Sequence, residues 1–217
     1  MSRNVTQNTQ KCFARPEKFG LRLLLTVLGV TVQGFGLSWL VRLELGADPF
    51  TNFMVGCDKI LPTGFGTTQL IMNLIMFIYV ILFGRNMIGF GTIANMVFLG
   101  YIIDFFNWIW DGVLPADLFA ARWMAYLVLL PAFACLILGA ATYMSAGLGT
   151  SPYDGIPFII SEQLKKPFKY CRMVWDIVFM IVGFLLGGGF GAVTLLVAFF
   201  AGPIINGVKR QVDKLLA

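Results

Sequence analysis

Long apolar stretches without a charged residue alternate with short polar connections along most of the chain. Five stretches contain no charge, and they cover 23–41, 60–84, 86–103, 123–153 and 177–208. A helix needs about 20 apolar residues to cross a hydrocarbon core of about 30 Å, so each stretch can cross at least once. The last can cross twice if Gly187-Gly188-Gly189 interrupts it. We therefore predict six membrane-spanning helices, at about 19–41, 65–84, 89–111, 122–146, 170–187 and 190–208.

A repeat is superimposed on this pattern. The segment Leu45–Phe50 (LGADPF) recurs as Leu148–Tyr153 (LGTSPY), a shift of 103 residues. The same shift pairs Gly36 with Gly139, Leu61 with Leu164, Phe65 with Phe168 and Gly84 with Gly187, and a contraction by three then pairs Phe90-Gly91 with Phe190-Gly191. Each copy carries three predicted spans, and an odd number inverts a copy in the bilayer. The sequence predicts an all-α polytopic membrane protein of two inverted three-helix repeats, each with a short helix after its first span.

The basic residues indicate which way the chain crosses the membrane. With six spans, thirteen of the sixteen lysines and arginines fall on the side of the N-terminus, and only Arg42, Lys59 and Arg122 fall on the other. Cytoplasmic loops are enriched in Lys and Arg, so both termini are predicted to be cytoplasmic. The predicted parts are a basic cytoplasmic segment (1–18), the first repeat (19–112), an extracytoplasmic linker (113–121), the second repeat (122–208) and a cytoplasmic tail (209–217).

Composition supports this class and excludes others. The chain is 58% hydrophobic and 12% charged, whereas soluble domains are about 25% charged. The net charge of +5 is scattered over separate loops, so we expect no nucleic acid among its partners. The absence of histidine excludes His-based metal sites and Ser-His-Asp triads. No acidic metal motif or activated nucleophile is present either, and we expect no enzyme activity, cofactor or metal.

The repeated loop has a local explanation. Asp48-Pro49 and Ser151-Pro152 each place a helix N-cap residue before a proline, which fits the first helical position. Gly46 and Gly149 would end the preceding span and permit a left-handed turn. Two structures fit: a helix lying along the membrane surface, or a broken helix that re-enters the membrane and directs its N-terminus at a central cavity.

Charged groups at membrane depth are the first candidates for a binding site, because burying them is costly. Asp176 lies about six residues into the fifth span, roughly 9 Å deep at 1.5 Å per residue. Its counterpart in the first repeat is Asn73, and Asp104 near the end of the third span is a further candidate. The structural alternative for Asp176 is a pair with Arg172 on the same helix face. For Asp104 it is a position at the outer interface.

The remaining binding candidates lie in the repeated loops and the neighbouring spans, and they are Asp48, Asp154, Asn95, Trp175 and Tyr153. Helix capping or turn chemistry is the alternative role for Asp48 and Asp154. Asn95, Thr92 and Gln33 are also candidates for hydrogen bonds that join neighbouring spans. Trp175 and Tyr153 are placed unlike interfacial aromatic residues and could line a cavity.

Several motifs occur together in a family-like order. A glycine-containing first span precedes Leu45–Phe50, Gly91-Thr92-Ile93-Ala94-Asn95 and Asp104 lie in the third span, and Leu148–Asp154 follows. Over about 20–210 this order resembles the YczE/YitT-like group of bacterial integral membrane proteins. The resemblance implies a small multi-pass protein of the bacterial plasma (inner) membrane. It says little about a substrate.

Two functions from different classes fit this architecture. The first is a secondary transporter or small-solute permeation protein that works by alternating access, with an unknown solute and, if transport is coupled, a proton carried by Asp176 or Asp104. The second is a membrane scaffold that stabilises or regulates a partner. A polar cavity between the repeats would favour transport, and a closed apolar bundle would favour the scaffold. The lipid bilayer is a partner in both, and a homodimer is a further expectation.

Overall fold

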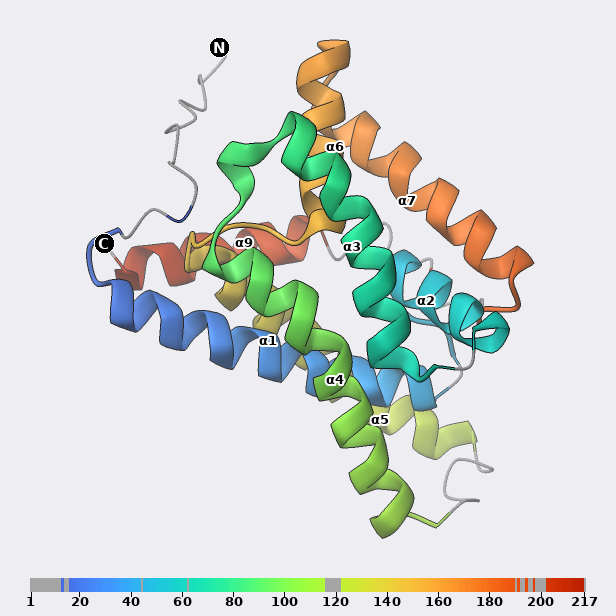
Figure 1. Ribbon diagram of the computed structural model, residues 1–217. Coiled ribbons are helices and arrows are strands. Elements are labelled where there is room, and N and C mark those ends of the chain that lie inside the picture. Colours follow the sequence, from blue (N-terminus) through green and yellow to red (C-terminus); the bar gives the residue numbers. More distant parts are fainter. Residues whose placement is uncertain are drawn as a thin grey trace.

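The fold consists of helices throughout the part of the chain that the computed structural model describes (Figure 1). That part comprises residue 13 and residues 16–43, 45–61, 63–115, 122–189, 191, 194, 197 and 202–216. Its α-helices are α1 (Phe19–Arg42), α2 (Pro49–Ile60), α3 (Phe65–Phe83), α4 (Phe90–Val113), α5 (Arg122–Ser145), α6 (Pro152–Leu164), α7 (Phe168–Leu185) and α9 (Gly202–Leu216). One 3-10 turn, η1 (Arg85–Met87), joins α3 to α4. The predicted all-α class is confirmed for these residues.

Four helices are long and apolar enough to cross a membrane, judged by length and composition. They are α1, α3, α4 and residues Trp123–Ser145 of α5, and they coincide with the first four predicted spans. The chain is therefore a multi-pass membrane protein. Their outer faces carry large exposed apolar side chains, such as Leu24 of α1 and Leu130 of α5, as expected for surfaces in contact with lipid.

The last two predicted spans are not among these four helices. Helix α7 covers the predicted fifth span, but it carries Lys169, Arg172 and Asp176 within 18 residues and is not one of the four. Nine of the nineteen residues of the predicted sixth span, 190–208, lie outside the described residues, as do most of the N-terminal segment 1–18 and the linker 113–121. Helix α9 begins at Gly202 and continues to Leu216, so the predicted tail 209–217 is helical through residue 216.

The short helices α2 and α6 begin as the sequence predicts. Asp48 caps α2 by accepting a hydrogen bond from the Thr51 backbone N–H, and Pro49 is the first helical residue. Ser151 caps α6 by accepting from the Asp154 N–H, and Pro152 follows it. The proline lacks only an N–H that no helix partner would accept at this position. Both predicted N-caps are confirmed.

The loop before each short helix packs closely against a threonine of the other part of the chain. Gly46 and Gly149 have φ angles of +92° and +110°, the left-handed region that glycine adopts without steric cost. A Cβ atom on Gly46 would lie 2.3 Å from Thr194 Oγ1, and one on Gly149 would lie 2.5 Å from Thr92 Oγ1. Both glycines are therefore required by conformation and by space.

Helices from the two halves of the chain pack against each other. We call 19–113 the first half and 122–216 the second half. Helix α1 packs along α5, as Figure 1 shows, and also contacts α4, while α2 packs on α7 and α3 on α6. The α1–α5 contact is close because a Cβ on Gly139 would lie 2.3 Å from the Gln33 N atom, and one on Gly29 would lie 2.5 Å from the Tyr143 N atom.

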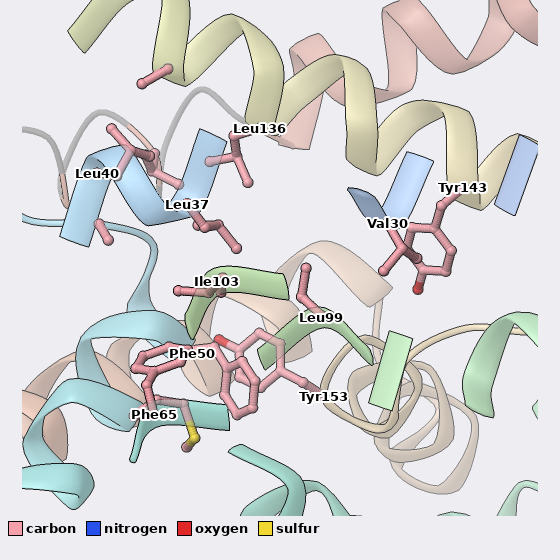
Figure 2. Packing of buried hydrophobic residues seen from close by; sticks show 14 residues of the cluster. Val30, Leu37, Leu40, Phe50, Phe65, Leu99, Ile103, Leu136, Tyr143 and Tyr153 are labelled. Carbon is pink, nitrogen blue, oxygen red and sulfur yellow. The ribbon is translucent and has the colours of Figure 1, made fainter. Parts of the chain in front are cut away.

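A buried apolar core joins both halves (Figure 2). It combines Leu37 of α1 and Leu99 of α4 with Leu136 of α5. Figure 2 also shows the rings of Phe50 and Tyr153 side by side, and they stack with centroids 4.5 Å apart. These two residues follow Pro49 and Pro152, so the starts of α2 and α6 meet in the core.

Candidate functional site

A cavity of about 500 Å³ opens between the two halves. The first half contributes Gln33, Asp48, Gln69 and Asn95 to its wall, from α1, the start of α2, α3 and α4. The second half contributes residues of α5, α6 and α7, among them Tyr143, Ser151, Tyr153, Asp154, Lys169, Arg172 and Asp176. Small-molecule sites occupy about 300–1,000 Å³, so the volume suits a small solute.

The second-half side of the cavity is built around one guanidinium group. Arg172 Nη1 lies 2.6 Å from Asp154 Oδ1, and Arg172 Nε lies 3.0 Å from Asp176 Oδ2. The guanidinium carbon also lies 4.9 Å from the centroid of the Tyr153 ring, a cation–π distance. Arg172 thereby joins α6 to α7.

The groups around Arg172 complete the network. The Tyr153 hydroxyl donates to the second oxygen of Asp176, and the Ser151 hydroxyl donates to the second oxygen of Asp154 at 2.7 Å. The Ser151 N–H in turn donates to the Tyr143 hydroxyl at 2.8 Å. Every oxygen of these two carboxylates therefore accepts a hydrogen bond.

Asp48 lies on the opposite wall and is only half satisfied. Its Oδ2 accepts from the Thr51 N–H at 3.1 Å, while its buried Oδ1 has no hydrogen-bond partner among the described residues. Burial raises the pKa of the Asp48 carboxyl, which lies outside the four candidate spans. Hydrogen bonds from Thr51 lower that pKa, and the nearby charges of Asp176 and Asp154 raise it.

Three amide side chains line the cavity without satisfying one another. Gln69 is 3% exposed and Asn95 is 4% exposed, and neither forms a side-chain hydrogen bond in the described part of the chain. The Gln33 Oε1 atom is buried and equally without a partner there. Buried polar atoms are normally hydrogen-bonded, so this group is available to a ligand or to water.

Comparison with known proteins places the chain in a family. The sequence profile described as "Family of unknown function (DUF6198)" matches residues 20–210. The chain belongs to the DUF6198 family.

Similar proteins occur in bacteria. The chain is 27% identical over 198 residues to the uncharacterized membrane protein YczE of Bacillus subtilis (strain 168), covering 90% of this chain and 89% of that one. It is 24% identical over 181 residues to the uncharacterized protein YyaS of the same organism, covering 82% and 88%. An uncharacterized protein of Haemophilus influenzae is 27% identical over 186 residues, covering 83% and 79%. No solved structure matches the chain. The resemblance to YczE-like bacterial membrane proteins is thus confirmed.

In this DUF6198 member the cavity collects five of the eight predicted binding residues, namely Asp176, Asp48, Asp154, Asn95 and Tyr153. The pair between Asp176 and Arg172, which the sequence gives as the structural alternative, is confirmed as well. The capping role of Asp48 is likewise present. Asp176 and Asp48 therefore have a structural role and also line the cavity.

The other three predicted residues lie outside the cavity wall. Asn73 is 1% exposed, and both of its side-chain polar atoms lack a partner in the described structure. Asp104 accepts a hydrogen bond of 2.7 Å from the Gly66 N–H at the start of α3, so it serves a helix N-terminus. Trp175 packs against the Tyr153 ring, with centroids 6.0 Å apart.

The described part of the chain contains no hydrogen bond between spans from the side chains of Thr92, Gln33 or Asn95. Thr92 bonds locally, accepting from the Gly89 N–H and donating to the Met87 carbonyl. Gln33 and Asn95 face the cavity instead of bonding to a neighbouring helix.

Sequence reasoning missed Gln69, Lys169 and Arg172 as cavity residues. A signal existed for Gln69, which lies four residues before Asn73 on the same helix face of an otherwise apolar span. For Arg172 the signal was its i,i+4 spacing to Asp176, which indicated the pair but not its position in the cavity wall.

Proposed function

We propose that the protein is a secondary transporter, or a related small-solute permeation protein, that works by alternating access. The observation that carries this proposal is the cavity of about 500 Å³, which both halves line with charged and unpartnered polar side chains. A closed apolar bundle would have favoured the scaffold function, and a polar cavity between the halves favours transport. We continue to expect no catalytic activity.

We further propose six spans arranged as two inverted repeats, and the loop contacts support this. Cβ atoms built on Gly89 and Gly191 would lie 2.1 Å from the Leu148 carbonyl oxygen and 2.0 Å from the Leu45 carbonyl oxygen. Leu45 and Leu148 are 103 residues apart and are therefore equivalent positions of the repeat. The first half contacts this position of the second half through Gly89, and the second half contacts it in the first half through Gly191. The contacting residues Gly89 and Gly191 are 102 residues apart. This separation is closer to the repeat shift of 103 than the separation of Gly91 and Gly191, which the sequence comparison paired.

The contact between α1 and α5 repeats in the same way. A Cβ on Gly36 would lie 2.7 Å from the Leu136 N atom, and one on Gly139 would lie 2.3 Å from the Gln33 N atom. Adding 103 to Gly36 and Gln33 gives Gly139 and Leu136. Each contact therefore maps onto the other, as a two-fold axis between α1 and α5 requires.

In this proposal α7 is the fifth span, with its charges turned to protein. Val174, Val178 and Ile181 form an exposed apolar face of α7, while Arg172 and Asp176 face the cavity. The distribution of basic residues favours cytoplasmic termini. Rocking of one half against the other would then expose the cavity to each side in turn.

Cysteine accessibility tests this proposal without a known substrate. In a variant lacking the native cysteines, Ala140→Cys places a thiol in the cavity wall. We expect a membrane-impermeant thiol reagent to label it in both right-side-out and inside-out vesicles. Ala125→Cys is the matched control, because Ala125 is buried and does not line the cavity. Labelling of Ala140→Cys from one side only would support a fixed scaffold.

A further inference from the structure

The polar groups of the cavity fall into a bonded set and an unbonded set. Arg172, Asp154 and Asp176 satisfy one another with help from Tyr153 and Ser151. The unbonded set consists of Asp48 Oδ1, Gln33 Oε1 and the side chains of Gln69 and Asn95. A ligand therefore has to satisfy the unbonded set, since the bonded set already has its partners.

The charge balance indicates the sign of that ligand. Three carboxylates, those of Asp48, Asp154 and Asp176, line the cavity, and the half-buried guanidinium of Arg172 is paired with two of them. Lys169 also lines it, but its side chain is exposed and forms no ion pair with any described residue. The interior is thus net negative, which favours a cation and disfavours an anion.

We propose that the cavity binds a small organic ammonium compound, with its charged nitrogen at Asp48 and its apolar part against Leu37, Leu99 and Leu136. This inference rests on the proposed transport function and names its substrate class. An ammonium group has three donors and no acceptor, which matches the unpartnered oxygens of Asp48 and Gln33. The three leucines line the same cavity and offer apolar surface to the remainder of the ligand.

Other ligand classes fit less well. A neutral solute would leave the Asp48 carboxylate without a counter-charge, and burying an uncompensated charge is costly. An anionic solute would meet three carboxylates and could pair with Arg172 only by displacing Asp154 or Asp176 from it. The ammonium class requires neither change.

Three probes of similar size and different charge test the class. The purified full-length protein in detergent micelles is titrated calorimetrically with phenethylamine, 2-phenylethanol and 3-phenylpropionate, each against a micelle blank. We expect phenethylamine to bind at least ten-fold more tightly than the alcohol or the acid. Equal or tighter binding of either of those two, or no binding of the amine, overturns the proposal.

Two variants test the location. Asp48→Asn retains an N-cap side chain and should weaken amine binding at least ten-fold, while the exposed Asp111→Asn should leave it within two-fold. Gln33→Leu keeps every charge and should weaken binding about five-fold. Amine affinity unchanged by Asp48→Asn overturns the assignment, and unchanged affinity of Gln33→Leu does so if Asp48→Asn does not fold.

The outcomes separate this inference from the proposed transport function. Amine binding with one-sided labelling of Ala140→Cys would uphold the ligand class and contradict alternating access. Two-sided labelling without amine binding would uphold alternating access and overturn the ligand class.

Discussion

Helices α2 and α6 begin alike, but their first turns differ in how completely their polar atoms are bonded. At α6 the Ser151 hydroxyl both caps the helix and donates to Asp154, which in turn binds Arg172. At α2 the Asp48 carboxylate caps the helix with one oxygen and leaves the other buried without a partner in the described structure. The two sites share a backbone design and differ in chemistry.

This difference indicates different roles for the two helix starts. A fully bonded network stabilises one arrangement of α6 and α7, because removing any member leaves a buried group unpaired. An incomplete network stabilises the fold less but is ready to bind a ligand. The second half therefore contributes a fully bonded, rigid network to the cavity wall, and the first half contributes polar atoms without a hydrogen-bond partner.

The largest expected loss of stability comes from substituting the glycine that the loops before α2 and α6 have in common. Gly46→Ala and Gly149→Ala should each lower the free energy of unfolding by about 3 kcal/mol, from left-handed strain together with steric overlap at a threonine hydroxyl. Thermal unfolding of the purified variants measures this. Gly112→Ala is the control, since no atom lies within 4 Å of a Cβ there. Loss in one loop variant and not the other would contradict the equivalence of the loops.

Next in size is the disruption of the bonded site. Arg172→Met leaves Asp154 and Asp176 without their counter-charge and should cost about 2 kcal/mol, below the range for fully buried pairs because the Arg172 side chain is 31% exposed. The readout is the midpoint of thermal unfolding. Lys169→Met, one turn earlier on α7, removes the same charge from a side chain with no ion pair in the described part and should cost little. An equal loss of stability in both variants would show that the ion pairs of Arg172 do not stabilise the fold.

The two caps should respond differently to substitution. Ser151→Ala removes a cap and a bond to Asp154 and should cost about 1 kcal/mol. Asp48→Asn keeps the cap and removes a charge that Asp154 and Asp176 repel, so it should not lower the stability of the ligand-free protein. Chemical denaturation of both variants beside the parent gives the comparison. A clear loss for Asp48→Asn would show that its charge has a stabilising partner.

The smallest effect is a dependence on pH. Because the pKa of Asp48 is raised in the fold, its contribution to stability is complete below its ordinary pKa of about 3.9 and is lost as pH rises through the raised value. The parent should therefore lose stability relative to Asp48→Asn as the pH rises above about 4. The charged and titratable groups that share the cavity wall with Asp48 are Asp154, Asp176, Arg172, Lys169, Tyr153 and Tyr143. Melting curves of both proteins over this range measure it, and parallel curves would contradict it.

Features that depend on local sequence were predictable. The first four spans follow from uninterrupted apolar length, and both N-caps follow from an Asp or Ser before a proline. The pair between Arg172 and Asp176 follows from helical spacing. In each case the interacting groups lie within a few residues of each other, so the chain itself fixes their geometry.

Features that depend on packing between helices were not predictable. Gln69 reaches the cavity wall because α3 packs against α2 and α6, and no local pattern indicates which side of α3 those helices cover. Asn73, one turn from Gln69, is buried away from the cavity wall. The repeat pairing of Gly91 with Gly191 maximised identical letters, whereas the backbone contacts of Gly89 and Gly191 match each other more closely.

The crossed contacts at Leu45 and Leu148 bear on how the protein is made. The backbone at Gly89 contacts Leu148, and Gly191 contacts Leu45, so each half completes the other's loop. A nascent chain that has emerged only through the first half lacks the residue that Gly89 contacts. Insertion of the first helices can thus precede stable folding, and the native arrangement of either half awaits synthesis of the second.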